Sequence, residues 1–198
     1  MVIDLRRDCE QLFLREEQFM SNFNCGDEDL NDFFNREAIL YQRQMLAETV
    51  FFRHKSNGST VCAFSYSASS IKTVDLPGSR RKKAKEFVPK EKSLKAYPGI
   101  LIGRLGVATE FNGKGIGSQL MKIIKDYCLF QFPHHVRYLL VDAYNTPAVV
   151  GFYQKNYFLP VFSTEEQEKE TYGQAPSDTL QTRYMFYDMI NWRNMIIP

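Results

Sequence analysis

The chain has 198 residues, which suits one domain with an ample core. It is 44% hydrophobic and 24% charged with a net charge of +2, a globular composition that excludes a disordered, collagen-like or coiled-coil chain. No apolar run approaches the roughly 18 residues of a membrane helix, and charged residues near the start leave no apolar signal-peptide core. We therefore expect a soluble cytoplasmic protein.

The charge is distributed unevenly along the chain. Between Arg80 and Lys95, eight cationic residues stand against two glutamates, a local net charge of +6, so the remainder carries −4. Such a segment can follow a phosphate backbone, although charge runs are usually solvated surface. Aromatic residues are sparse in it, so contact with RNA would be electrostatic and shape-based. The densest part of the run is Arg80, Arg81, Lys82 and Lys83.

Cysteine and histidine spacing gives no framework for a disulfide scaffold or a metal site. The four cysteines at 9, 25, 62 and 128 are dispersed, and the three histidines show no ligand spacing. We expect reduced, mostly buried thiols and no metal.

The first half of the chain predicts a helix and a hairpin. Apolar residues recur at spacings of three and four from Asp27 to about Met45, which indicates a helix. The β-rich runs Thr49 to Phe52 and Thr60 to Tyr66 flank Asn57-Gly58, a dipeptide that favours a tight antiparallel hairpin. Prolines and the basic run make residues 71–98 an irregular excursion with room for a short helix.

Strands and helices alternate in the second half. The predicted elements are strand 100–107, helix 118–130, strand 138–143, a helix that starts at Thr146-Pro147 and runs to 156, strand 158–162, an acidic stretch 165–170 and a strand near 184–189. This order, with antiparallel candidates at both ends, predicts an α/β fold with a mixed sheet in a single domain over residues 1–198.

A glycine-rich turn, Asn112 to Ser118, lies between a predicted strand and a helix. Consecutive backbone N–H groups at a helix start suit a pyrophosphate, and glycines let a phosphate approach them closely. The spacing excludes a dinucleotide fingerprint, which needs glycine or alanine where Ser118 and Leu120 stand. It also excludes a P-loop, because Gly115 follows Lys114. A plain glycine-rich turn remains the alternative.

Three segments together resemble the GNAT superfamily of acetyl-CoA-dependent N-acetyltransferases: Leu105-Gly106-Val107, the turn Asn112 to Gly117, and Phe152 to Phe158. The family pattern of the turn begins with glutamine or arginine, so Asn112 departs from it. Tyr157 stands where the family usually has glycine. The matched motifs extend from residue 105 to residue 158.

The resemblance implies a mixed, mostly antiparallel central sheet flanked by helices, with acetyl-CoA bound at the splay between two central strands. It also implies a cofactor site, in which the main chain of Leu105, Gly106 and Val107 pairs with the pantetheine arm and Asn145 touches that arm. The backbone amides expected around the pyrophosphate belong to Asn112, Gly113, Lys114, Gly115, Ile116, Gly117 and Ser118.

Tyr153 is the candidate general acid. A phenol with a pKa near 10 is protonated at neutral pH and can donate its proton to a departing thiolate, whose conjugate acid titrates near 8.5. Core packing is the alternative for this tyrosine. No convincing general base stands out, which favours an α-amine, with a pKa of about 7.7–8.0, over a lysine at about 10.4.

Short segments extend the resemblance to toxin-like GNAT enzymes, which acetylate the amino group of aminoacyl-tRNA and are usually encoded beside an antitoxin. These segments are Asn24-Cys25-Gly26, Leu30-Asn31, Leu76-Pro77, Arg104-Leu105 and Phe152-Tyr153. Arg104 either lines the cofactor or acceptor site or pairs with a carboxylate. The implied partners are an amine acceptor and an antitoxin, with no membrane; a homodimer stays open.

Three functions therefore remain open from the sequence. The first is an N-acetyltransferase that acts on aminoacyl-tRNA as a toxin. The second is a GNAT enzyme that acetylates a small amine or a protein N-terminus. The third is a non-catalytic module that binds acyl-CoA.

Overall fold

The computed structural model describes residues 3–15, 20, 22–74, 76–85, 94–132 and 135–197. The chain divides into two compact units. Unit 1 comprises Met1–Ser67 and Ile102–Gln131, and unit 2 comprises Ala68–Leu101 and Phe132–Pro198. No helix among the described residues is long and apolar enough to cross a membrane.

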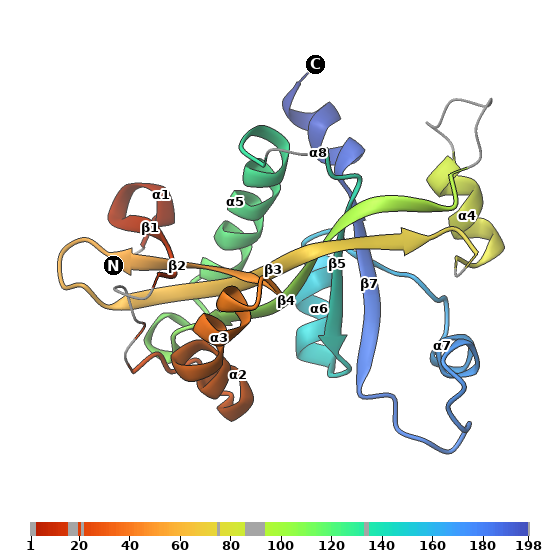
Figure 1. Ribbon diagram of the computed structural model, residues 1–198, viewed down its shortest axis with the longest axis horizontal. Helices are drawn as coiled ribbons and strands as arrows, with labels where there is room; N and C mark the ends of the chain where they lie inside the picture. Colours follow the sequence, from red (N-terminus) through yellow and green to blue (C-terminus); the bar gives the residue numbers. More distant parts are fainter. Residues whose placement is uncertain are drawn as a thin grey trace. The chain divides into compact units, whose positions relative to one another are not determined.

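Unit 1 contains a sheet of strands β1, β2, β3 and β4, in that order, with helices on both faces (Figure 1). Its elements are α1 (Leu5–Asp8), β1 (Cys9–Phe13), α2 (Glu28–Asp32), the π-helical turn η1 (Phe33–Glu37), α3 (Ala38–Arg43), β2 (Glu48–His54), the first part of β3 (Thr60–Lys72), the last part of β4 (Ala96–Val107), the 3₁₀ turn η2 (Thr109–Phe111) and α5 (Ile116–Phe130).

The predicted hairpin is confirmed. Strand β2 pairs antiparallel with β3, from Glu48 opposite Tyr66 to Arg53 opposite Thr60. Gly58 has a φ of +74°, and its N–H donates to the carbonyl of His54 at 2.9 Å, so the Asn57-Gly58 dipeptide supplies the left-handed residue that the turn needs. Strand β1, which the sequence pattern did not indicate, adds to β2 antiparallel.

The helix predicted from Asp27 to Met45 is present in three parts. Asp27 caps α2 by accepting the N–H of Leu30 at 3.0 Å. The π-helical turn η1 then widens the helix before α3, and the chain leaves α3 through Met45, whose φ is +56°. Phe33, Phe34 and Ala38 are buried as their spacing predicts, whereas Met45 is exposed.

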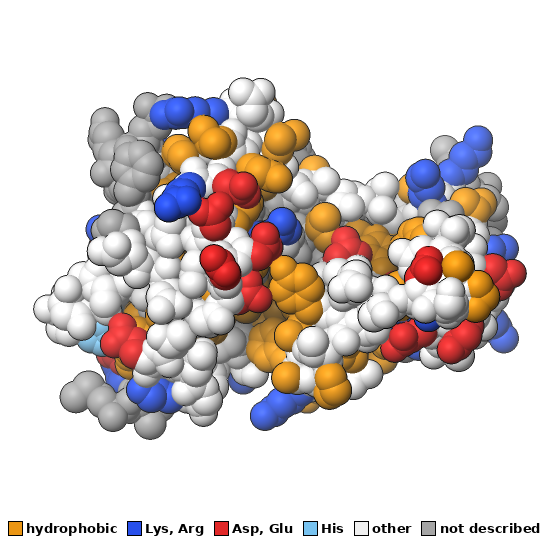
Figure 2. Space-filling view, turned by 90° about the horizontal axis from the view of Figure 1, so that it is seen from below, with side chains coloured by type: hydrophobic (Ala, Val, Ile, Leu, Met, Phe, Trp, Pro, Cys, Tyr) orange, Lys and Arg blue, Asp and Glu red, His pale blue; other side chains and the backbone are white. Residues whose placement is uncertain are grey.

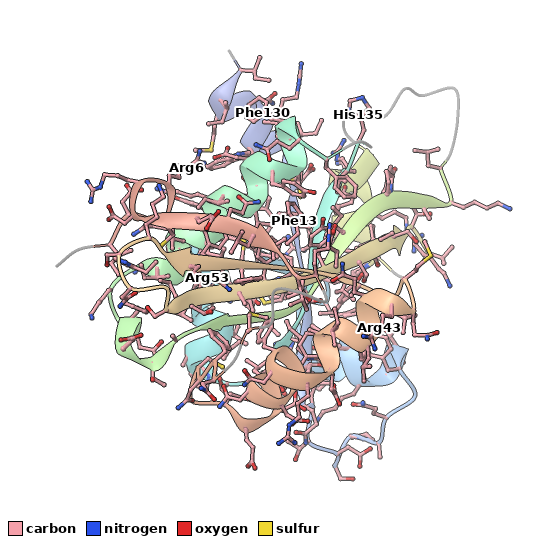
Figure 3. The ribbon with its side chains drawn as sticks, turned by 60° about the vertical axis from the view of Figure 1, so that its left-hand side comes forward. Arg6, Phe13, Arg43, Arg53, Phe130 and His135 are labelled. Carbon is pink, nitrogen blue, oxygen red and sulfur yellow. The ribbon has the colours of Figure 1, made fainter. Side chains whose placement is uncertain are left out.

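Helix α5 and the α2–η1–α3 segment cover opposite faces of the unit 1 sheet (Figure 1). Phe13 of β1 lies on the α5 face of the sheet (Figure 3). Its ring packs with that of Tyr127, with the ring centroids 6.4 Å apart. The hydroxyl of Tyr66 on β3 hydrogen-bonds to the hydroxyl of the same Tyr127 at 3.1 Å. On the other face, Phe23 and Phe34 pack edge to face at 5.3 Å. The buried side chains of β2 alternate between these two layers.

Unit 2 contains a sheet with the order β3-β4-β5-β7-β6. Besides its parts of β3 and β4, its elements are α4 (Gly78–Lys85), β5 (Tyr138–Tyr144), α6 (Pro147–Lys155), β6 (Leu159–Pro160), α7 (Glu165–Thr171), β7 (Thr182–Asp188) and α8 (Met189–Ile196). Its core packs Ile71, Leu76, Tyr97, Tyr138, Leu140 and Phe186 with Val161 and Phe162.

The acidic stretch at 165–170 is helix α7, anchored by a buried carboxylate. Glu168, 1% exposed, accepts the Nε–H of Arg183 at 2.8 Å and the backbone N–H of Tyr184 at 2.6 Å. The strand predicted over 158–162 is only two residues long, Leu159–Pro160, because the chain leaves the sheet at once toward α7.

The excursion predicted at 71–98 is shorter and more regular than expected. Strand β3 continues to Lys72 and β4 starts at Ala96, so both reach into the predicted excursion. Thr73 joins the two strands, because its N–H donates to the carbonyl of Lys95 at 2.9 Å. The short helix expected there is α4, whereas the charged positions 86–93 lie outside the described residues.

Strands β3 and β4 belong to both units and make one seven-stranded sheet. The pairs β1–β2, β2–β3, β5–β7 and β6–β7 are antiparallel, and β4–β5 is parallel. Among the described residues the parallel pairing runs only from Gly99 opposite Tyr138 to Leu101 opposite Leu140, although both strands continue. The predicted mixed, mostly antiparallel sheet flanked by helices is confirmed.

All four cysteines are free thiols, as expected from their spacing. Cys9, Cys62 and Cys128 are buried, and Cys25 is half-buried. Burial raises the thiol pKa of Cys9 to about 11 and that of Cys128 to about 12, so both stay protonated at neutral pH.

Candidate functional site

The end of β4 in unit 1 approaches a loop so closely that it requires a glycine. A Cβ atom on Gly106 would lie 3.0 Å from Cε1 of Phe23 and 3.3 Å from Cβ of Cys25. Its neighbours Leu105 and Val107 are half-buried, and alternation along a strand directs their side chains to the opposite face. Glycine at 106 therefore allows the side chains of Phe23 and Cys25 to pack closely against this strand.

The glycine-rich turn lies in unit 1 between η2 and α5. Gly113 and Gly115 have φ values of +72° and +78°, which other residues rarely adopt, and no atom lies within 4 Å of where their Cβ atoms would be. Gly115 is the N-cap of α5 and supplies no side-chain cap. The first turn of an α-helix leaves its amides without intrahelical acceptors, so the start of α5 offers backbone donors, whereas the N–H of Lys114 donates to the carbonyl of Phe111 at 3.4 Å.

The side chains around this turn do not obstruct it. The Nζ of Lys114 donates to the carbonyl of Glu110 at 2.6 Å and lies 5.5 Å from the centre of the Phe111 ring, which directs the lysine back along η2. Asn112 has an extended backbone and an exposed side chain, whereas Ile116 is buried and anchors the start of α5. Open space beside two glycines and an uncapped helix start together fit a pyrophosphate group.

Tyr153 lies on α6 in unit 2, a helix that begins as the sequence predicts. Thr146 caps it by accepting the N–H of Val149 at 3.3 Å, and Pro147 is its first residue. Tyr153 is 8% exposed, and its ring packs edge to face with Phe152 and Phe158 at 5.1 and 5.4 Å. Burial raises its pKa above the usual value of a phenol, so the hydroxyl stays protonated.

The C-terminus of α6 is closed by a Schellman motif that holds Tyr153. The N–H of Phe158 donates to the carbonyl of Tyr153 at 3.0 Å, and the N–H of Tyr157 donates to that of Gln154 at 2.9 Å. Tyr157 has a φ of +69° in the position where such motifs prefer glycine, and its side chain is 71% exposed. The position where the family usually has glycine therefore does need a left-handed backbone here.

Asn145 follows β5 in unit 2 and is tied to the segment before β7. Its Nδ2 donates to the carbonyl of Leu180 at 3.0 Å, and its backbone N–H donates to that of Gln181 at 2.9 Å. These bonds fix the position of its side-chain carbonyl.

Arg104 packs on an aromatic ring in unit 1. Its guanidinium carbon lies 5.1 Å from the centre of the Phe33 ring, and Nη1 donates to the carbonyl of Gly103 at 3.0 Å. The sequence left open whether Arg104 pairs with a carboxylate; among the described residues its guanidinium packs on the Phe33 ring instead.

The basic run is not uniform. Arg80 is half-buried with its guanidinium 5.9 Å from the Phe186 ring centre, and Arg81 donates from Nη2 to the carbonyls of Val74 and Leu76 at 3.2 and 3.1 Å. Lys82 is exposed. The side chain of Lys83 lies outside the described residues. Two of the four predicted phosphate ligands therefore have structural contacts as well.

The predicted site residues are divided between the two units. Unit 1 holds Leu105–Val107, Arg104 and the glycine turn, and unit 2 holds Tyr153, Asn145 and the start of the basic run. Sequence reasoning noted Asn24-Cys25-Gly26 and Leu30-Asn31 only as a resemblance and missed Phe23 and Asn35, which join them beneath β4. The asparagines at 24, 31 and 35 around a glycine were the available signal.

Comparison with known proteins finds a family model that matches part of the chain and several solved structures with a similar fold. The model of the acetyltransferase (GNAT) family matches residues 84–158. The chain is similar to AtaT complexed with acetyl-methionyl-tRNAfMet, at 18% identity and a TM-score of 0.68, covering 96% of this chain and 99% of the other. It is similar to AtaTR bound with AcCoA, at 17% identity and 0.67, covering 96% and 98%. A tyrosine-to-phenylalanine mutant of KacT matches at 14% and 0.68, covering 96% and 99%.

Proposed function

We propose that the chain transfers the acetyl group of acetyl-CoA to a primary amine and releases coenzyme A, because the acetyltransferase (GNAT) family model matches residues 84–158. The observation that carries this proposal is the turn at the start of α5. Two left-handed glycines precede a helix without a side-chain cap, in the segment that the family model matches. Backbone donors from Gly113 to Ser118 would bind the pyrophosphate of acetyl-CoA.

The main chain of Leu105–Val107 is proposed to pair with the pantetheine arm as an added strand. This proposal is supported by the β4–β5 pairing, which among the described residues ends at Leu101, six residues before the end of β4. An amide in this segment would polarise the thioester carbonyl, and such a fixed donor stabilises developing negative charge without reorganisation. Asn145, held by Leu180 and Gln181, is proposed to contact the same arm.

Tyr153 is proposed to protonate the departing thiolate. Its buried hydroxyl has a raised pKa and is therefore neutral across the physiological range. A thiol titrates near 8.5, so the departing thiolate is a weaker base than a phenolate. We propose that the hydroxyl hydrogen-bonds to the thiolate as the C–S bond breaks, and that the proton which the acetylated amine loses balances the one which the thiol gains. The amine attacks as its free base, which an α-amino group supplies at neutral pH more readily than a lysine.

For the acceptor we propose the α-amino group of aminoacyl-tRNA. Supporting this are the fold similarity to AtaT complexed with acetyl-methionyl-tRNAfMet and the exposed cation Lys82 on α4. An antitoxin partner is proposed by analogy with the AtaT mutant bound to the C-terminus of AtaR.

A small cationic amine or a protein N-terminus is the second candidate acceptor. Exposed acidic side chains gather over α2 and η1, on the face shown in Figure 2; they include Glu28, Asp29, Asp32 and Glu37. Their negative charge would repel a polyanion and attract a protonated amine.

One assay separates these acceptors. The protein is incubated with labelled acetyl-CoA and, in parallel, with charged tRNA, uncharged tRNA, short peptides and polyamines. We expect label transfer to charged tRNA and none to uncharged tRNA. Transfer to peptides or polyamines alone would replace the tRNA proposal by the second candidate. No binding of acetyl-CoA at all would remove the acetyltransferase proposal.

A further inference from the structure

The segment Asn24-Cys25-Gly26 with Leu30-Asn31 has no role in the proposed chemistry, yet side-chain hydrogen bonds hold it in place. Asn31 lies on α2 and holds the loop from below. Its Oδ1 accepts the N–H of Cys25 at 2.8 Å and contacts Sγ of the same residue at 3.3 Å. Its Nδ2 donates to Oδ1 of Asn24 at 3.0 Å.

Asn35 holds the residue before this segment. Its Oδ1 accepts the N–H of Phe23 at 2.9 Å, and its Nδ2 donates to the carbonyl of Phe23 at 2.8 Å. The same Nδ2 donates to the carbonyl of Asn31 at 2.7 Å, which links the π-helical turn η1 back to α2. One side-chain amide thus satisfies both backbone groups of Phe23 and fixes its own orientation.

The loop held in this way presses against the end of β4. The Phe23 ring and Cys25 would lie 3.0 and 3.3 Å from a Cβ atom on Gly106, and the carbonyl of Asn24 accepts the N–H of Thr109 at 2.9 Å. Gly26 has a φ of +87°, and a Cβ there would lie 3.4 Å from the methyl group of Thr109. The loop therefore contacts the chain on both sides of Val107, immediately before the glycine turn.

Aromatic packing extends this support along the strand. Phe23 packs on Phe34 and Phe34 on Phe33, each pair edge to face at 5.3 Å, and Arg104 stacks on Phe33. Arg104 and Gly106 are two residues apart and so lie on the same face of β4. The π-helical turn places both phenylalanines under these residues.

We propose that Asn31 and Asn35 are positioning residues for acetyl transfer. They hold residues 23–26 as a rigid support beneath β4, which fixes the main chain of Leu105–Val107 for the pantetheine arm. The inference rests on the proposed function, because that function assigns the arm to this strand. Displacement of a reacting group by about 1 Å can cost about 100-fold in rate, so a support of this kind would act on the reaction without touching acetyl-CoA.

The first test removes each side-chain amide. Asn31→Ala and Asn35→Ala delete two or three hydrogen bonds each and free the loop, so we expect acetyl-CoA to bind about tenfold more weakly and kcat to fall. Binding is measured by calorimetry with acetyl-CoA, and kcat in the charged-tRNA assay. Asn31→Asp keeps the acceptor for Cys25 but loses the donor to Asn24, and should lie between Asn31→Ala and the wild type.

Asn57→Ala is the matched control for lost stability. Oδ1 of Asn57 accepts the N–H and the hydroxyl of Ser59 at 3.1 and 3.0 Å, so the change also removes two bonds from a loop of unit 1. Acetyl-CoA affinity should be unchanged in this variant. Affinities of Asn31→Ala and Asn35→Ala that equal that of Asn57→Ala, in folded protein, would overturn the inference.

A second pair of variants keeps both asparagines and changes the contact between Gly106 and Phe23 instead. Gly106→Ala introduces a methyl group 3.0 Å from the Phe23 ring and should weaken acetyl-CoA binding at least tenfold. Phe23→Leu removes the obstructing ring atoms, so Gly106→Ala with Phe23→Leu should recover most of the loss. No recovery would mean that Gly106 serves only the cofactor, and this outcome would overturn the inference even if the asparagine variants did not fold.

The outcomes separate this inference from the function on which it rests. Wild-type protein that does not bind acetyl-CoA contradicts the proposed function. Wild-type protein that binds acetyl-CoA, with Asn31 and Asn35 variants that bind it equally well, leaves that function standing and contradicts only the positioning role.

Discussion

Two helix ends in this molecule use left-handed residues for opposite purposes. At the start of α5, Gly113 and Gly115 turn the chain, and the backbone donors of the first helical turn have no side-chain cap. At the end of α6, Tyr157 takes the same left-handed conformation, and the final carbonyls are satisfied by Tyr157 and Phe158. The first end is open to a ligand, and the second is closed around Tyr153.

The difference lies in which group must stay available. A turn that binds an anion with its backbone must keep its N–H groups unsatisfied and its surroundings small, so glycine is required. A helix end that fixes a side chain benefits from complete hydrogen bonding, and it can tolerate the strain of a tyrosine because the motif determines the backbone. The following predictions test whether the two ends are separable in this way.

The largest effect is expected from Tyr153→Phe at the closed end. Loss of the hydroxyl should lower kcat by about 100-fold or more, the usual scale for a general acid, with acetyl-CoA affinity unchanged within about twofold. Steady-state kinetics and calorimetry measure the two quantities. Tyr138→Phe removes another buried hydroxyl of unit 2 and should leave kcat unchanged. Equal kcat values for the two variants would disprove the acid role.

A smaller effect is expected at the open end from Gly115→Ala. The Cβ strains a residue with a φ of +78° and crowds the exposed donors, so acetyl-CoA affinity should fall about tenfold or more while kcat at saturation changes less. Gly58→Ala imposes comparable strain on the β2–β3 hairpin, where φ is +74°, and should cost only stability. Equal losses of affinity in both variants would show that the turn acts through folding alone.

Tyr157→Gly should stabilise the protein. Glycine relieves the left-handed strain at the end of α6, which we expect to raise the free energy of unfolding by about 1 kcal/mol and the Tm by about 2–4 °C. Differential scanning calorimetry measures this shift, and kcat should stay within twofold of wild type. A lower Tm would mean that contacts of the exposed tyrosine outweigh its backbone strain.

The smallest effect is expected from Lys82→Gln on α4. If Lys82 contacts one phosphate, its removal should reduce the salt dependence of tRNA binding by about one ion, or about three- to fourfold in affinity between 50 and 200 mM salt. Arg81→Gln should also lower the Tm, because Arg81 bonds two backbone carbonyls. A salt slope for Lys82→Gln that equals the wild-type slope would remove this residue from the RNA contact.

Periodicity and turn chemistry were sufficient for most elements, because their signals are local. The Asn57-Gly58 hairpin, the Thr146-Pro147 helix start and the glycine turn all form where the sequence places them. Strand β1 was missed because it is five residues long and only Cys9 in it is buried. In η1, which divides the first helix, Asn35 bonds to Phe23, a contact between separate segments that periodicity does not report.

The candidate site was predictable wherever a motif constrains the backbone. Gly106 and Tyr157 appeared in the sequence as a match and a departure, and the structure gives each a physical reason: close approach of Phe23 and a left-handed φ. Charge density alone could not show that Arg80 lies on Phe186 while Lys82 faces solvent. Such differences arise from the packing of one helix and require coordinates.

Because Thr73 and Lys95 are hydrogen-bonded to each other, the stretch between them is a suitable place to insert the corresponding segment of another protein. Because this bond joins β3 and β4 where they leave the sheet, we expect the pairing of the two strands to tolerate changes between them that keep the core residue Leu76 and the bonds of Arg81. Under the proposed function, exchange of this stretch tests whether it contributes to the choice of acceptor. A chimera that retains Thr73 and Lys95 should keep its acetyl-CoA affinity while its choice of amine changes.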